Sequence, residues 1–100
     1  MSINIGIFTF DGPYKTATTL KDKSGIYAIL SLNGVKINII DIGESSMVKT
    51  RIEGHFKDSS LYKQYKGFLM VAVCYTPNIQ QAGRRLIQKE LRLLLKPVCG

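Results

Sequence analysis

Two short apolar runs on either side of a turn dipeptide constrain the fold of this chain more than any other feature. Residues 26–30 and 36–42 are rich in isoleucine, and Asn33-Gly34 lies between them. Asn-Gly suits the positive backbone angles of a tight hairpin turn, so the two runs are predicted to form adjacent antiparallel strands. A third apolar run, residues 67–76, is rich in Phe, Val and Tyr and predicts a buried third strand beside them.

Segments with the periodicity of a helix lie on both sides of this third strand in the sequence. Residues 78–95 place leucines on one side and arginines on another, which predicts an amphipathic helix that Pro97 ends. Residues 46–56 carry apolar side chains four apart and predict a further helix, and residues 59–66 have the spacing of a short one. Strands mixed with helices indicate the α+β class with a largely antiparallel sheet.

The N-terminal segment is predicted to add one strand. Residues 3–9 alternate in the period of a strand, and Asp11-Gly12-Pro13 is predicted to end it. The 100 residues contain no repeat or linker, so we expect a single domain overall. Within it, residues 1–22 form the N-terminal strand and connection, and residues 23–100 form a small three-stranded antiparallel sheet with flanking helices.

Composition narrows the partners and the compartment. The longest apolar run, residues 68–75, is far shorter than the roughly 20 residues that span a bilayer, so no membrane partner is expected. The first residues lack the basic start of a secretory signal, which predicts a cytoplasmic protein. Cys74 and Cys99 have neither zinc-site spacing nor disulfide density and are expected to be reduced.

The charge balance favours an anionic partner. Lys and Arg number 14 against 7 Asp and Glu, and the net charge of +7 attracts phosphate groups. Nucleic acid is therefore the expected partner, although a basic face that only keeps the protein soluble would have the same composition.

Five short motifs follow one another along residues 23–100. They are, in order, Gly25-Ile26-Tyr27, Asp41-Ile42-Gly43, Arg51 with His55, residues 84–91, and Lys96-Pro97-Val98-Cys99-Gly100. Together they resemble the GIY-YIG nuclease family, whose fold is a three-stranded antiparallel sheet with flanking helices. The first triplet is intact, whereas Asp41 stands where the second triplet of the family has a tyrosine.

The resemblance implies metal-dependent hydrolysis of nucleic-acid phosphodiesters, with DNA the expected substrate and Mg²⁺ or Mn²⁺ the cofactor. It implies that Tyr27 acts on the attacking water, that Arg51 faces the scissile phosphate, and that His55 occupies a less constant polar position. Such hydrolysis needs a group that positions water, cations near the phosphate oxygens and a metal held by a carboxylate. Taken alone, Tyr27 would be a core residue and the other two an ordinary solvated helix face.

The position that would hold the metal departs from the family pattern. The metal-binding Glu of the family lies nine residues before the terminal proline, where this chain has Gln88. A neutral amide should bind the metal much more weakly. Glu90 is about 200° round the helix and cannot replace it, whereas Asp41 and Glu44 could form a relocated metal site. Gly100 stands where the family has its final asparagine.

Three functions therefore stay open. The first is an endonuclease domain impaired by Gln88, and the second is a catalytically silent nucleic-acid-binding module of the same fold. The third is a protein-interaction or dimerisation module that uses residues 3–10 as an exposed edge strand; the pattern predicts no oligomeric state. The basic side chains expected to contact nucleic acid are those of Lys49, Lys57, Arg84, Arg85, Lys89 and Arg92.

Overall fold

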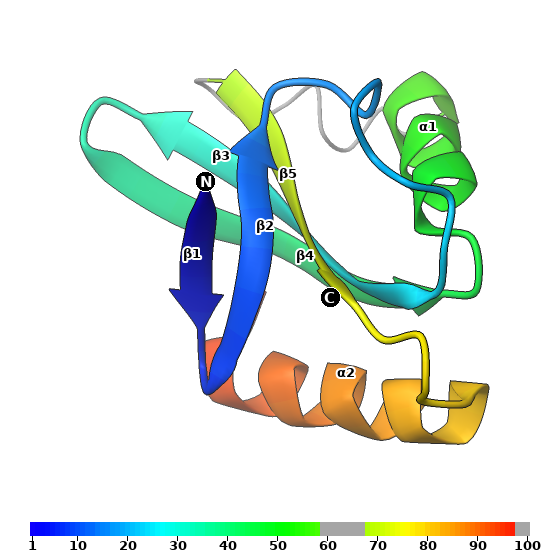
Figure 1. Ribbon diagram of the computed structural model, residues 1–100. Helices are drawn as coiled ribbons and strands as arrows, with labels where there is room; N and C mark the ends of the chain where they lie inside the picture. Colours follow the sequence, from blue (N-terminus) through cyan, green and yellow to red (C-terminus); the bar gives the residue numbers. More distant parts are fainter. Residues whose placement is uncertain (59–67, 98–100) are drawn as a thin grey trace.

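The computed structural model describes residues 1–58 and 68–97, so the short helix predicted over residues 59–66 lies outside the described residues. Within this part of the chain, five strands and two helices follow one another (Figure 1). They are β1 (Ser2–Ile5), β2 (Phe8–Tyr14), β3 (Gly25–Asn33), β4 (Lys36–Ser45), α1 (Val48–Asp58), β5 (Phe68–Tyr75) and α2 (Gln81–Leu95).

The described strands form one antiparallel sheet in the order β1-β2-β5-β3-β4. The predicted α+β class, the β3–β4 hairpin and the third strand β5 are confirmed. The hairpin turn has Gly34 as its first central residue, with a φ of 64°, and Asn33 pairs with Lys36. A positive φ at this position is the reason that glycine is favoured there.

The predicted three-stranded sheet is too small, because the N-terminal segment contributes two strands and not one. Gly6 has a φ of 61° and lets the chain fold back, so that β1 pairs with β2 and β2 pairs with β5. The Asp11-Gly12-Pro13 sequence does not end a strand, since β2 continues through it with an irregular register between Asp11 and Tyr14. Residues 1–14 therefore belong to the same sheet as the hairpin.

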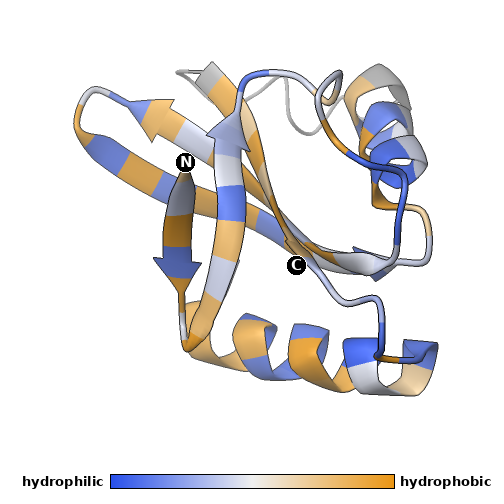
Figure 2. Ribbon diagram, viewed as in Figure 1, coloured by the Kyte–Doolittle hydropathy of each residue, from blue (hydrophilic) through white to orange (hydrophobic). Residues whose placement is uncertain are grey.

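The two helices pack on opposite faces of the sheet (Figure 1). On one face, Val48 and Ile52 of α1 and the loop residue Leu20 pack with Tyr27 and Ile29. On the other face, α2 packs on the alternate residues of β3 and on the apolar side chains of the N-terminal hairpin. Figure 2 shows hydrophobic residues alternating with hydrophilic ones along α2, as a helix with one buried side requires.

Most apolar side chains of residues 3–10 lie in the core or pack against it. Ile5 and Phe10 are buried in the core beneath α2, and Ile3 and Phe8 pack against the same cluster. β1 still forms one edge of the sheet. Residues 3–10 are therefore not one exposed strand, as the interaction-module hypothesis assumed, but a hairpin whose first strand lies at an edge.

A single irregularity in β4 decides which side chains face which helix. Ile29 pairs with Asp41, whereas the next residue of β3, Leu30, pairs with Ile39, so Ile40 is the extra residue of a bulge. Because side chains alternate between faces, an extra residue reverses the facing of everything that follows it. Asp41 and Gly43 consequently lie on the face of the sheet that α1 covers.

Two further sequence expectations concern the membrane and the thiols. None of the helices in residues 1–58 and 68–97 is both long and apolar enough to cross a bilayer. Cys74 is a free, half-buried thiol whose pKa is raised by burial and by the nearby charge of Asp11. Cys99 lies outside the described residues.

Candidate functional site

Tyr27 of β3 and His55 of α1 are joined by a hydrogen bond. The Tyr27 hydroxyl oxygen lies 2.8 Å from His55 Nε2, and the two ring centroids are 5.7 Å apart. Tyr27 is only 3% exposed, because its ring lies in the core between the sheet and α1. The ring is thereby fixed by packing, and its hydroxyl meets the half-buried imidazole.

Gly43 makes room for this tyrosine. It is the cross-strand partner of Tyr27, and a Cβ added at Gly43 would overlap the Cζ and hydroxyl oxygen of the tyrosine ring. The Tyr27 ring therefore lies across the β4 backbone at the one position without a side chain. The sequence marked Gly43 only as part of the Asp41-Ile42-Gly43 motif, and its contact with Tyr27 was missed because their pairing depends on the bulge in β4.

The surroundings of the pair shift both protonation equilibria. Burial raises the pKa of the Tyr27 phenol, while a hydrogen bond and the positive charge of Arg51 act in the opposite direction and Asp41 adds to the rise. Burial, followed by the charge of Arg51, lowers the pKa of His55, against a smaller opposing effect of Asp41. At neutral pH the phenol is therefore protonated and the imidazole neutral, so Tyr27 donates and His55 Nε2 accepts.

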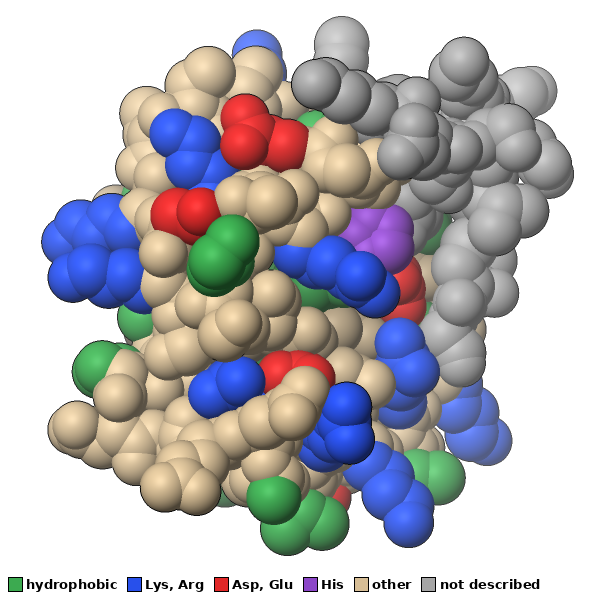
Figure 3. Space-filling view, turned by 90° about the vertical axis from the view of Figure 1, so that its right-hand side faces the viewer, with side chains coloured by type: hydrophobic (Ala, Val, Ile, Leu, Met, Phe, Trp, Pro, Cys, Tyr) green, Lys and Arg blue, Asp and Glu red, His purple; other side chains and the backbone are tan. Residues whose placement is uncertain are grey.

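A polar cleft of about 280 Å³ opens next to Arg51. It lies between the end of β4, the start of α1 and the first turns of α2. Its lining residues are Glu44, Ser45, Ser46, Arg51, Gln81 and Arg85. In Figure 3 the histidine, coloured purple, lies at the surface among blue basic side chains, with acidic ones in red between them. The cleft thus combines two exposed guanidinium groups with hydroxyl and amide groups, which suits an anionic ligand with several oxygens.

Gln88 lies on the α2 face that borders β4. Gln81, Arg85, Gln88 and Arg92 are spaced four, three and four residues apart, so they share one side of the helix. Arg85 Nε is 3.7 Å from Glu44 Oε1, and Arg92 Nε donates to the Ile42 carbonyl at 2.8 Å. Half-buried Gln88 is between these two arginines and is therefore beside the part of β4 that contains Gly43.

The structure does not bring Asp41 and Glu44 together as a relocated metal site. Asp41 pairs with Ile29 and lies on the α1 face, whereas Glu44 pairs with Ile26 and lies on the α2 face. Each carboxylate also has an arginine from α2, since Arg92 is 3.3 Å from Asp41 and Arg84 is 3.0 Å from Glu44. The two acids are three residues apart in one regular stretch of β4, so the alternation of side chains puts them on opposite faces.

The donor set does not fit a divalent metal. Magnesium is usually held by one or two carboxylates together with substrate oxygens, but the position predicted to hold the metal has an amide at Gln88. Among the described residues, no group of three or more His, Cys, Asp or Glu side chains could hold a metal ion. The charge of Asp41 acts on both Tyr27 and His55, but this carboxylate is itself paired with Arg92 at 3.3 Å.

The basic side chains predicted to contact nucleic acid do not form one surface. Arg85 and Lys89 are exposed on α2, and half-buried Arg92 lies on the same helix. Arg84, in contrast, is buried, donates to Glu44 and to the Ile79 carbonyl, and has a structural role in place of the predicted binding role. Lys49 Nζ reaches the Thr18 carbonyl at 3.4 Å on a different side of α1 from Arg51, and the Lys57 side chain lies outside what the structure describes.

Comparisons of this chain with protein-family models, with curated proteins and with solved structures find no match. The resemblance to GIY-YIG nucleases therefore stays a prediction that rests on the motif residues.

Proposed function

We propose that this protein is a nuclease-type nucleic-acid-binding domain that holds a phosphodiester in the cleft between α1 and α2. Hydrolysis in this domain is suppressed, because Gln88 occupies the position at which the GIY-YIG family has its metal-binding glutamate. The observation that carries the proposal is the hydrogen-bonded Tyr27–His55 pair, held over Gly43 beside the guanidinium of Arg51.

The pair has the chemistry to move one proton. A water bound at the Tyr27 oxygen can give its proton to that oxygen while Tyr27 passes its own proton to neutral His55 Nε2. The lowered pKa of His55 keeps the imidazole neutral at neutral pH, so that Nε2 can accept the proton. Arg51 supplies positive charge next to the same hydroxyl and can bind a phosphate oxygen there.

The cleft supports binding of a backbone and not of one base sequence. Its guanidinium, hydroxyl and amide donors are groups that contact phosphate and sugar oxygens in protein–nucleic acid complexes. The net charge of +7 adds a long-range attraction that salt screens. We expect modest sequence preference and affinity that falls steeply as ionic strength rises.

The test is cleavage of supercoiled plasmid DNA at low salt with Mg²⁺ or Mn²⁺. We expect the unchanged sequence to bind without cutting and Gln88→Glu to cut, because the substitution puts a carboxylate at the position predicted to hold the metal. Gln80→Glu is the matched control, since it makes the same chemical change at an exposed residue just before α2 that does not line the cleft. Adding Tyr27→Phe to Gln88→Glu should abolish the cleavage while leaving the fold intact.

The second candidate is a catalytically silent nucleic-acid-binding module. It is favoured because the acidic residues of the site are paired with arginines. Asp41 and Glu44 are both paired with arginines, and Gln88 is neutral, so the site holds more positive than negative groups. If the unchanged protein and Gln88→Glu both bind DNA and neither cuts it, the nuclease part of the proposal fails and this module takes its place.

A further inference from the structure

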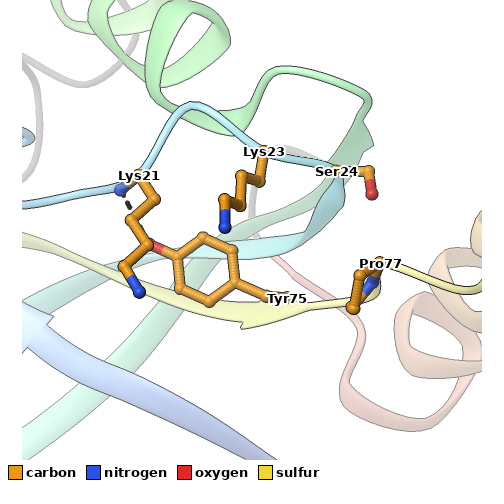
Figure 4. Close-up of a pocket in the computed structure, with 5 residues that line it drawn as sticks. All are labelled: Lys21, Lys23, Ser24, Tyr75 and Pro77. Atoms are coloured by element: carbon orange, nitrogen blue, oxygen red, sulfur yellow. Dashed lines mark hydrogen bonds between the residues drawn. The ribbon is translucent and has the colours of Figure 1, made fainter.

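A second cavity lies on the other side of the start of β3, away from the cleft that contains Arg85. It has a volume of about 140 Å³ and lies between residues 21–24, here called the strap, which precede β3, and the end of β5. Its lining residues are Lys21, Lys23, Ser24, Tyr75 and Pro77 (Figure 4). In this view the ammonium groups of the two lysines lie on two sides of the Tyr75 ring, and Pro77 lies beyond its far end.

The walls of this cavity are held in place by hydrogen bonds between the strap and β5. The backbone N–H of Lys21 donates to the Tyr75 hydroxyl at 3.0 Å, which fixes the ring. The Thr76 N–H donates to the Ser24 carbonyl at 2.9 Å, and the Ser24 hydroxyl donates to the Thr76 carbonyl at 3.1 Å. A cavity that is already formed costs less free energy to fill than one that must be ordered by the ligand.

The charge in the cavity is not neutralised by its lining. Both lysines are exposed, and the residues that line the cavity include no carboxylate. The carboxylate of the neighbouring Asp22 is bound to α1 and not to the cavity. It accepts hydrogen bonds from the Thr50 N–H at 3.0 Å and from the Thr50 hydroxyl at 2.6 Å. The two ammonium groups are therefore positioned to attract an anion beside an aromatic ring.

Position connects the cavity to the candidate site. Tyr75 pairs with Gly25, which precedes Tyr27 by two residues on β3. Two residues along a strand correspond to roughly 7 Å, and adjacent strands are about 5 Å apart. Both tyrosines pack against the core on the α1 face of the sheet. The cavity therefore lies within about one or two nucleotides of a phosphate placed at Tyr27 and Arg51.

From these observations we infer that the cavity is a nucleotide subsite, in which Lys21 and Lys23 bind a phosphate and the Tyr75 ring supports the attached base or sugar. The inference rests on the proposed function, because the nucleotide belongs to the strand that the cleft binds. The small volume suits one nucleotide moiety, since pockets for whole small-molecule ligands usually measure roughly 300 Å³ or more. Stacking of a base on an aromatic ring tolerates any sequence, as backbone recognition in the cleft does.

The first test is a titration of the ¹⁵N-labelled chain, followed by NMR, with thymidine monophosphate, inorganic phosphate and a six-nucleotide oligothymidylate. We expect the amide signals of Ser24 and Thr76 to shift with all three, least with inorganic phosphate. Shifts with phosphate alone that do not grow with the mononucleotide would reduce the cavity to an anion site and overturn the inference. Absence of shifts at both amides would overturn it as well.

The second test compares oligothymidylate affinity by fluorescence anisotropy in two double variants of equal charge. Lys21→Gln with Lys23→Gln should weaken binding roughly tenfold and reduce the salt slope by about 0.7, the value for one lost phosphate contact on a single strand. Lys36→Gln with Lys96→Gln removes two exposed charges from the hairpin turn and the end of α2, and should change affinity less than twofold. Equal weakening in both pairs would refute the subsite.

A third arm separates this inference from the proposed function. Arg51→Gln with Arg85→Gln removes the two guanidinium groups of the cleft. If that variant loses oligonucleotide affinity and the Lys21 and Lys23 variant does not, the subsite is wrong and the cleft stands. If only the lysine variant loses affinity, the cleft assignment is wrong. Mononucleotide binding without any effect of the lysines on oligonucleotide affinity would show a site for free nucleotides and also refute the inference.

Discussion

The fit between Gly43 and Tyr27 predicts a large effect from the smallest possible substitution. In Gly43→Ala the new methyl group would overlap the Cζ and hydroxyl of Tyr27 and lie 2.8 Å from its Cε1. Tyr27 is 3% exposed, so the ring has no open space into which it can move without disturbing the core. Overpacking of this kind costs about 1–3 kcal/mol. A lost hydrogen bond to His55 adds about 1 kcal/mol.

The free energy of unfolding should therefore fall by about 2–4 kcal/mol in Gly43→Ala, out of the roughly 5–15 kcal/mol of an ordinary domain. Urea denaturation followed by circular dichroism measures this difference. The matched control is the same substitution in a Tyr27→Val background, where the ring is absent. There, alanine should be neutral or stabilise by up to about 1 kcal/mol, because glycine is unfavourable inside a strand.

The double-mutant cycle decides whether the ring is the cause. A coupling energy of about 2 kcal/mol or more between positions 27 and 43 is expected, since the two residues are in direct contact. A cost in Gly43→Ala below about 0.5 kcal/mol would show that the ring does not lie across the glycine. An equal cost in both backgrounds would place the cause in the backbone of β4 and refute the argument.

Three further predictions concern single side chains. Arg84→Ala should destabilise the protein by about 1.5–3 kcal/mol in urea denaturation, because it removes the buried guanidinium paired with Glu44 at 3.0 Å and leaves only the longer contact with Arg85, whereas exposed Arg85→Ala should cost less than about 1 kcal/mol. The Thr76 hydroxyl is buried with no partner in the described part of the chain, so Thr76→Val should raise the thermal midpoint by the equivalent of about 1 kcal/mol; a decrease would show that the hydroxyl is bound. The folded pKa of His55 is lowered, so the unfolded chain binds its proton more readily and stability should fall as the pH decreases below about 6.5. Urea denaturation at several pH values should show this decrease, and His55→Gln should remove it.

Much of the fold follows from local pattern. The isoleucine runs around Asn33-Gly34 and the Phe- and Val-rich run of β5 have the composition and period of strands, and the helix predicted to end before Pro97 is α2. Where prediction failed, at residues 3–10, the reason was a glycine with positive φ inside an otherwise regular alternation. A turn of this kind changes the number of strands without changing the composition of the segment.

The candidate site was predictable in its residues but not in its arrangement. Tyr27, Arg51 and His55 were selected from motif order, and the structure brings them together because β3 and α1 pack on one another. Arg84 was selected on charge alone, and its burial against Glu44 depends on how α2 docks on the edge strand. The cavity around Tyr75 had no signal at all in the sequence, since its walls come from segments about 50 residues apart.

By itself, the sequence determined the type and order of the elements from β3 to β5 and of both described helices, because strand and helix periods are set by neighbouring residues. Only the tertiary structure decided which residues face each other across the sheet. Without the bulge at Ile40, the hairpin register would pair Tyr27 with Ile42 and put Asp41 opposite Ala28. One extra residue reverses the facing of all that follows, and its placement depends on packing against both helices at once. That packing is a property of contacts distant in sequence, which no local pattern records.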